Sequence, residues 1–330
     1  MRQFYEYQPV VGYRYTPNLK ARILHEGGGY LIQVNETGFR SNRAFVKERA
    51  SGVRRVLLFG DSFTAGDSVP NHLRYSDLLE TRVPGLEVYN YGLPSSGTDQ
   101  HYLIWREYAQ EIEHDLVVIA VYVENIRRVV AGYRILQDEH GRKHLYAKPY
   151  FTLDQGQLEL HQVPPKPEPI EEDELPPEEF GLVDRSGRFP LLRKAVAALG
   201  VKEVVQRLTH YQPVPGYDSP DTPDWMLMRA ILAMWVRAAN KPVIIMPIPL
   251  SQHMDRLSDA RPYQARFREL AADLGCTLHD PLPDIMKHSA EERRSFRWEK
   301  DPHFTPKGNA VVADSLAPVI RRLLTEKRES

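Results

Sequence analysis

Ser62 stands where an apolar, β-prone run ends abruptly, in the segment VLLFGDS of residues 56–62. This run is typical of a buried strand of an α/β sheet that is followed by a loop and a helix. Ligands of open α/β sheets collect at the carboxyl ends of the strands, so a hydroxyl placed there suits a nucleophile. The alternative is that Ser62 only caps the next helix, because Asp and Ser are favoured N-cap residues.

A serine attacks a carbonyl group well only when an oriented base takes its proton. Asp301 and His303 flank Pro302 near the C-terminus. On one loop, a carboxylate in this position can reach Nδ1 of the imidazole while Nε2 faces the serine. We therefore predict that Ser62, His303 and Asp301 act together, with the Asp–His pair at another strand end.

Donors for the oxyanion of such a reaction are expected at the remaining strand ends. Asn125 stands just beyond the apolar run of residues 116–123, where its amide can donate into the site. The segment NYGLPSSGT, residues 90–98, follows another strand and offers backbone N–H groups. Each has a simpler interpretation, since Asn125 can merely terminate a strand and Gly97 can merely serve a turn.

The elements that position these residues alternate along the chain. Apolar runs predict strands over 53–59, 86–92, 116–123, 242–248 and 276–279. Patterned segments between them predict helices over 75–83, 100–112, 225–239, 262–274 and 310–326. This alternation predicts a three-layer α/β/α sandwich with a flavodoxin-like, mostly parallel five-stranded sheet.

Two segments depart from this pattern. Residues 1–52 are rich in Tyr, Arg and Gly, and predict a small β-rich N-terminal extension packed on the main domain of residues 53–330. An insertion at about 127–222 carries a Pro-rich and acidic run at 164–179, typical of an exposed segment. A predicted hairpin at 150–160 and helix at 191–208 flank that run, so we expect the insertion to form a cap.

Composition narrows the class of protein. The 330 residues are 42% hydrophobic and 26% charged with a formal net charge of −1, which gives no reason to expect a nucleic acid partner. The single cysteine, Cys276, excludes an internal disulfide and a cysteine-rich metal site. No run approaches the ~20 apolar residues of a membrane span, and the N-terminus lacks the apolar core of a signal peptide. We therefore expect a cytoplasmic protein.

The four blocks together resemble those of the SGNH, or GDSL, hydrolases. These blocks are GDSF at 60–63, the segment 90–98, Asn125, and Asp301-x-His303, in the family's order. The resemblance implies a flavodoxin-like sandwich and ester hydrolysis through an acyl-serine intermediate. It assigns Ser62 as nucleophile, His303 as base and Asp301 as its orienting acid. The oxyanion hole implied is the Ser62 N–H, one N–H of the second block and the Asn125 side chain.

Three departures from the family pattern bear on the site. The position five residues after Asn90, commonly glycine, is Ser95, and Gly97 lies two residues further on, so either N–H is a candidate donor. In the third block, Ile126 stands after Asn125 where the family usually has an acidic residue. The Asp–His spacing of two, rather than three, resembles members that act on carbohydrate esters, including polysaccharide acetyltransferases.

We expect a serine esterase that removes a small acyl group from a carbohydrate or another hydroxylated small molecule, with acetyl as the favoured acyl group. No metal or cofactor is required. Arg127 and Tyr122 are further candidates for substrate binding, although Arg127 and its neighbour Arg128 also suit a solvated strand end. An O-acyltransferase on the same residues is the first alternative, and a non-catalytic carbohydrate-binding relative is the second. The sequence leaves the oligomeric state open.

Overall fold

A parallel sheet of five strands forms the centre of the computed structural model, which describes residues 4–137, 143–170 and 212–326. Its strands lie in the spatial order β14-β13-β7-β5-β6. They span β5 (Arg54–Phe59), β6 (Leu86–Asn90), β7 (Leu116–Tyr122), β13 (Val243–Ile248) and β14 (Thr277–Leu278). Read from β6, this is the flavodoxin-like order 2-1-3-4-5. The predicted sheet is confirmed.

The middle of the sheet explains the apolar runs. Every residue of β7, with the sequence LVVIAVY, is buried, and β7 pairs with β5 on one side and β13 on the other. A strand covered on both faces has no solvated side, so its sequence shows no polar alternation.

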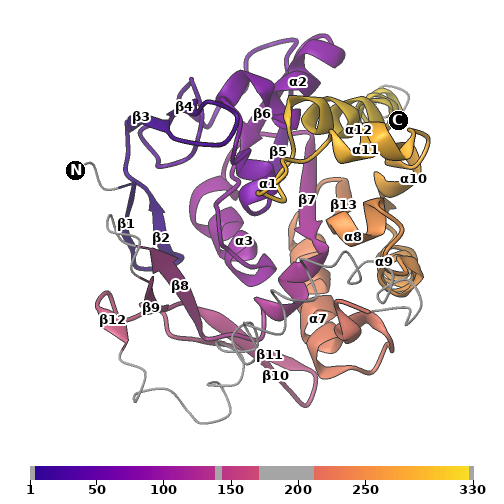
Figure 1. Ribbon diagram of the computed structural model, residues 1–330. Helices are drawn as coiled ribbons and strands as arrows, with labels where there is room; N and C mark the ends of the chain where they lie inside the picture. Colours follow the sequence, from indigo (N-terminus) through magenta and orange to yellow (C-terminus); the bar gives the residue numbers. More distant parts are fainter. Residues whose placement is uncertain (1–3, 138–142, 171–211, 327–330) are drawn as a thin grey trace.

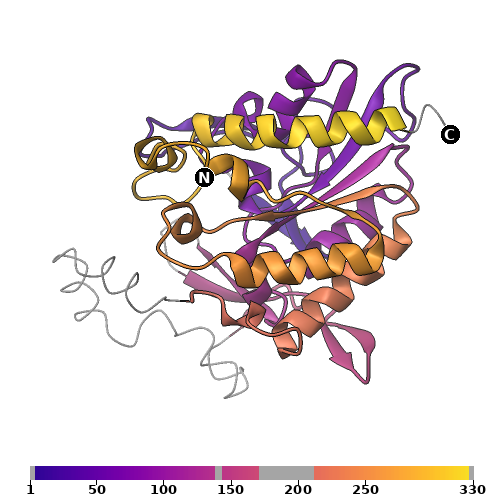
Figure 2. The same ribbon diagram turned by 90° about the vertical axis from the view of Figure 1, so that its right-hand side faces the viewer.

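Helices cover both faces of the sheet (Figures 1 and 2). Figure 2 shows α12 (Pro306–Glu326) and α9 (Arg261–Leu274) on opposite sides of the strands. The first packs beside α2 (Tyr75–Arg82), and the second beside α7 (Pro223–Ala238), which also contacts α3 (Thr98–Ile104). The α-helix predicted over 100–112 ends at Ile104. The chain continues as the π-helical turn η2 (Trp105–Ala109), in which Trp105 is buried.

Two hairpins precede the sheet in sequence. They pair β1 (Tyr5–Gln8) with β2 (Gly12–Tyr15) and β3 (Lys20–Ile23) with β4 (Tyr30–Gln33), all antiparallel. Apolar side chains of these segments belong to the same buried cluster as the central strands, among them Val11, Tyr13, Ile32 and Phe39. Figure 1 shows both hairpins beside the main domain.

Between β7 and α7 the chain forms further strands. The hairpin predicted at 150–160 is β10 (Tyr150–Asp154) paired with β11 (Gln157–His161). A second small sheet, in the order β12-β9-β8, was not predicted; its strands are β8 (Tyr133–Gln137), β9 (Lys143–Ala147) and β12 (Pro169–Ile170). Tyr133 and Leu145 form a separate small core there, too short a pattern to detect in sequence. The helix predicted at 191–208 and the end of the acidic run lie outside the described residues.

Short helical segments complete the connections. They are α1 (Ser62–Ala65), η1 (Asn71–Leu73), η3 (Val123–Arg127), η5 (Pro215–Tyr217), α8 (Ser251–Met254), α10 (Leu282–Ile285) and α11 (Ala290–Arg294). Among the described helices, none combines the length and apolar character that crossing a bilayer would need.

The turn from β5 into α1 is tightly packed at Gly60. A Cβ atom at this position would overlap Oγ1 of Thr64 and lie 3.1 Å from the carbonyl oxygen of Ala120 on β7. Thr64 cannot easily turn away, because its Oγ1 is hydrogen-bonded to Oη of Tyr75 at 2.7 Å. The close approach of β5, α1 and β7 therefore requires glycine here.

We predict that Gly60→Ala lowers the free energy of unfolding by roughly 1–3 kcal/mol, the usual cost of overpacking a filled interior. Urea denaturation followed by circular dichroism measures the change. A midpoint equal to that of the wild type would show that the turn has room to relax.

Candidate active site

Ser62 opens helix α1 directly after β5. The residue that caps this helix is Asp61, whose side chain accepts a hydrogen bond from the Phe63 N–H at 3.1 Å. The Ser62 hydroxyl is therefore not needed for capping. Its Oγ lies 2.7 Å from Nε2 of His303, within hydrogen-bonding distance.

His303 is held on its other side by Asp301. The distance from His303 Nδ1 to Asp301 Oδ1 is 2.5 Å, and the His303 backbone N–H donates to the same oxygen at 3.0 Å. The ring of Phe63 lies against the imidazole, with 4.8 Å between ring centroids. A continuous chain of contacts thus links a serine hydroxyl, an imidazole and a carboxylate, the arrangement that activates a serine nucleophile.

The loop that carries Asp301 and His303 does not follow a strand directly, contrary to our expectation. After β14 the chain passes through α10 and α11, and an isolated antiparallel bridge between Arg297 and Phe304 frames the loop before α12 begins. The reason is the strand order, because β14 is the edge strand and β13 and β7 separate it from β5. The segment before α12 returns to α1, as Figure 1 shows.

The electrostatics of the pair favour a charged carboxylate and a basic imidazole. Partial burial opposes ionisation of Asp301, but the hydrogen bond and charge of His303, together with the Ser68 hydroxyl, hold its pKa well below the usual range. Burial also opposes the charged form of His303. Its hydrogen bond to Asp301 and the nearby charges of Asp67, Asp301 and Asp61 outweigh burial, and raise the pKa of His303 above its ordinary value of 6.5.

Asn125 lies in η3, immediately beyond β7, and is completely buried. Neither Oδ1 nor Nδ2 of its amide has a hydrogen-bond partner in the described part of the chain. Buried polar groups usually have a hydrogen-bond partner, so an amide that has none is available to bind another molecule. An oxyanion could accept from Nδ2, which agrees with the role predicted for this residue.

Ser95 and Gly97 differ in the availability of their N–H groups. The Gly97 N–H donates to Oε1 of Gln100 at 3.2 Å, so it is already engaged. Ser95 is exposed and adopts a φ of +64°, the left-handed region that glycine enters most easily. Its conformation matches what a glycine at this position would provide, and favours Ser95 over Gly97 as the backbone donor.

The topology of the sheet brings these groups to one edge. Ser62, Ser95 and Asn125 follow β5, β6 and β7, and β5 lies between the other two strands. The direction of chain crossover reverses between β5 and β7, which is where ligands bind in open α/β sheets. The site is therefore at the position that the fold predicts.

The two further candidates lie differently. Tyr122 is buried at the end of β7, and its ring stacks on Phe63 with a centroid separation of 4.4 Å. Arg127 points to the surface, where it pairs with Glu124 at 3.3 Å and donates to the carbonyl of Pro213. Its neighbour Arg128 reaches inward instead, and donates from Nη1 to Asp61 Oδ2 and to the Ser96 carbonyl, each at 3.0 Å.

The sequence suggested a solvated strand end for Arg128, but its guanidinium is bonded to the buried Asp61 and to the Ser96 carbonyl. Arg128 links the turn before the nucleophile to the second-block loop, a contact that is apparent only once η3 is folded. Within residues 4–137, 143–170 and 212–326, no three His, Cys, Asp or Glu side chains are grouped to hold a metal ion.

The doubly wound sheet and the linked Ser62, His303 and Asp301 side chains at its switch point are those of a serine ester hydrolase. The sequence model of the GDSL-like lipase/acylhydrolase family matches residues 58–311. The chain belongs to this family.

Solved structures of similar fold include several esterases. A lipolytic protein of the G-D-S-L family from Veillonella parvula is 13% identical with a TM-score of 0.44, covering 82% of this chain and 100% of its own. The psychrotrophic esterase EstA from Pseudoalteromonas sp. is 12% identical with a TM-score of 0.44, covering 82% and 99%. An acetyl xylan esterase from Geobacillus stearothermophilus is 12% identical with a TM-score of 0.44, covering 84% and 97%. No curated protein sequence matches the chain.

We predict that Asp67→Asn moves the rising limb of the kcat/KM–pH profile to lower pH. The base must be neutral, so activity rises as His303 loses its proton. Asp67 is one of the charges that raise the pKa of His303, and its removal lowers that pKa. Asp314→Asn is the control, because Asp314 is an exposed carboxylate on α12 paired with Arg82. Equal midpoints for the two variants would contradict the prediction.

We predict that Asn125→Ala lowers kcat by about 10²–10³-fold, the effect of losing one oxyanion donor. Its stability changes little, because the amide has no hydrogen bond to lose. The matched control is Asn90→Ala. Asn90 donates at 2.7 Å to Thr64 and to Ser76 and accepts from Gly92 at 2.8 Å, so this variant loses stability by roughly 1–3 kcal/mol. Similar stability losses in both variants would argue for a structural Asn125.

Proposed function

We propose that the protein hydrolyses a carboxylic ester by an acyl-serine mechanism, with Ser62 as nucleophile, His303 as base and Asp301 as the acid that orients it. The observation that carries this proposal is the continuous contact from Ser62 Oγ through the imidazole to the Asp301 carboxylate. Membership of the acylhydrolase family supports the reaction class.

The steps follow from the contacts. Ser62 Oγ attacks the ester carbonyl carbon while its proton passes to Nε2 of His303. The N–H groups of Ser62 and Ser95 and the amide of Asn125 stabilise the oxyanion of the tetrahedral intermediate. Collapse breaks the bond to the alkoxy oxygen, which takes the proton from His303 and leaves as the alcohol. Water then attacks the acyl-serine with the same base, releasing the acid and restoring Ser62.

We further propose that the acyl group is small, such as acetyl, and that the alcohol is a carbohydrate or another hydroxylated small molecule. Phe63 lies next to the nucleophile and packs against Tyr122 and Phe304, with ring-centroid separations of 4.4 and 5.1 Å. The Phe63 ring also contacts His303, so aromatic side chains lie close to the base, which supports a short acyl chain. The Asp-x-His spacing of two supports a carbohydrate ester.

We predict that Ser62→Ala abolishes hydrolysis of p-nitrophenyl acetate and labelling by a fluorophosphonate probe. The probe forms a covalent bond only with an activated hydroxyl. Rates on p-nitrophenyl acetate, butyrate and octanoate, measured with the wild type, test the acyl length. Hydrolysis that persists in Ser62→Ala would refute the serine mechanism, and a preference for octanoate would refute the short acyl group.

Product analysis with acetylated sugars separates hydrolysis from acyl transfer. Free acetate as the main product supports an esterase, whereas acetyl groups on an added sugar acceptor would establish the O-acyltransferase alternative on the same residues. A wild type that neither turns over esters nor reacts with the probe would leave the non-catalytic carbohydrate-binding alternative.

A further inference from the structure

The second oxygen of the Asp301 carboxylate is held by two side chains that sequence reasoning did not associate with the site. Oδ1 faces His303, whereas Oδ2 accepts a hydrogen bond from Ser68 Oγ at 2.6 Å and lies 3.1 Å from Nε2 of His25. His25 is 276 residues away in sequence, in the N-terminal extension and outside the segment that matches the family.

The other nitrogen of His25 fixes the direction of this contact. The Gly27 backbone N–H donates to His25 Nδ1 at 3.2 Å, so Nδ1 is the acceptor of the ring. In the neutral imidazole the proton then belongs to Nε2, which makes His25 a hydrogen-bond donor to Asp301.

The segment around His25 is fastened to the loop that carries Asp301. The His25 ring meets Trp298 edge to face at a centroid separation of 4.8 Å. The adjacent Glu26 accepts hydrogen bonds at Oε1 from the backbone N–H groups of Lys300 and Asp301, at 3.1 and 3.2 Å. Side chain and backbone of the catalytic loop are therefore both bound by the extension.

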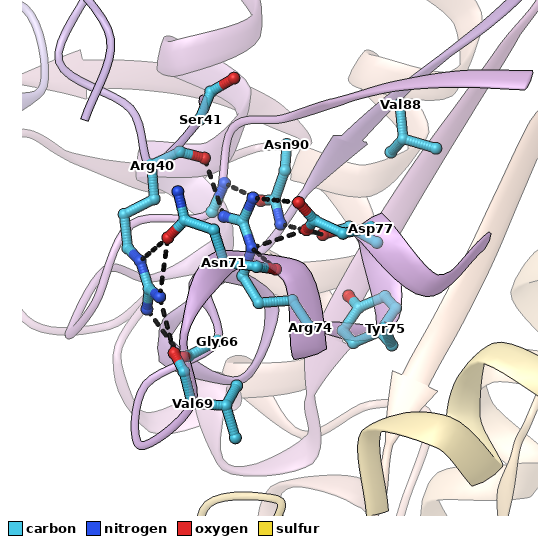
Figure 3. Close-up of polar contacts among 12 residues, drawn as sticks. Arg40, Ser41, Gly66, Val69, Asn71, Arg74, Tyr75, Asp77, Val88 and Asn90 are labelled. Carbon is cyan, nitrogen blue, oxygen red and sulfur yellow. Dashed lines mark hydrogen bonds and ion pairs between the residues drawn. The ribbon is translucent and has the colours of Figure 1, made fainter. Parts of the chain in front are cut away.

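A second residue of the extension, Arg40, binds the backbone at Gly66 and Val69, on either side of Ser68 in the sequence (Figure 3). Arg40 is completely buried, and its guanidinium donates to the carbonyls of Gly66 and Val69, each at 2.7 Å. It also donates to Oδ1 of Asn71 at 3.0 and 3.2 Å. These bonds fix both sides of the turn in which Ser68 adopts a φ of +74°.

We propose that the N-terminal extension is part of the catalytic machinery, in which His25 and Ser68 are positioning residues that hold the Asp301 carboxylate with Oδ1 toward His303. Arg40 contributes by holding the turn of Ser68. Two donors on Oδ2 prevent the carboxylate from rotating and stabilise its charge, as charge-assisted hydrogen bonds do. The proposal rests on the role of Asp301 in the proposed function.

A pair of variants at His25 separates the hydrogen bond from packing. The His25 ring contacts the rings of Trp298 and Tyr30 edge to face. His25→Phe keeps a ring in this place but cannot donate, whereas the amide nitrogen of His25→Gln can replace Nε2. We expect kcat of His25→Phe on p-nitrophenyl acetate to fall about tenfold with KM unchanged, the effect of one charge-assisted hydrogen bond. His25→Gln restores most of kcat. The control is Leu24→Gln, because Leu24 is adjacent and 88% exposed.

Ser68→Ala tests the second donor. We expect a similar loss of kcat, and a combined His25→Phe, Ser68→Ala variant in which the effects are not additive, because both act on one oxygen. The pH midpoint of kcat/KM moves in these variants, since His303 responds to the charge and orientation of Asp301, and it stays in place in Leu24→Gln. Thermal unfolding of each variant measures stability independently.

The outcomes distinguish this proposal from the mechanism beneath it. Equal activity of His25→Phe and His25→Gln, or an unchanged pH midpoint in His25→Phe and Ser68→Ala, overturns the positioning role while Ser62→Ala still shows a serine mechanism. Persistent activity of Ser62→Ala overturns the triad itself. Loss of thermal stability without a change in kcat of the folded protein would make the extension purely structural, and would also overturn the proposal.

Discussion

The charged carboxylate of Asp301 is the constraint on which the site depends. A partly buried carboxylate loses part of its hydration and is stabilised by hydrogen-bond donors, and this one has His303 on Oδ1 and Ser68 and His25 on Oδ2. Those donors come from the C-terminal loop, the turn after α1 and the N-terminal extension. Holding one side chain therefore requires three distant parts of the chain to be folded at once, and it fixes the imidazole against Ser62.

The oxyanion hole that we propose contains two groups in energetically unfavourable arrangements. The amide of Asn125 is buried without a partner in the described residues, and Ser95 occupies a left-handed conformation. Both arrangements cost free energy, and the surrounding sheet must supply it. Unfavourable arrangements of this kind are expected where a protein prepares polar groups for a ligand instead of for itself.

Segments outside the central sandwich stabilise the second-block loop. Tyr13 of the extension donates to the carbonyl of Pro94, and Gln100 donates to the carbonyl of Val11 at 2.8 Å. From the insertion, the buried Lys148 forms an ion pair with the buried Asp99 at the start of α3. Removing one partner of such a pair leaves the other charge buried and unpaired, which strongly destabilises the fold. We therefore expect the second-block loop, the extension and the insertion to fold together.

Sequence alone predicted the five-stranded sheet, the order of its elements and the catalytic candidates, because buried strands are continuous apolar runs and the Gly60-Asp61-Ser62 and Asp301-x-His303 blocks are local patterns. It missed the β12-β9-β8 sheet, because strands this short show no clear hydrophobic periodicity. It also placed the Asp301 loop at a strand end, because no sequence pattern shows that the chain passes through α10 and α11 before it returns to α1. Only the folded chain shows that the Gly97 N–H is already engaged, that Ser95 has a left-handed conformation and that Arg128 turns inward. It also brought His25 to Asp301, because contacts between residues so far apart in the chain depend on packing and not on neighbouring sequence.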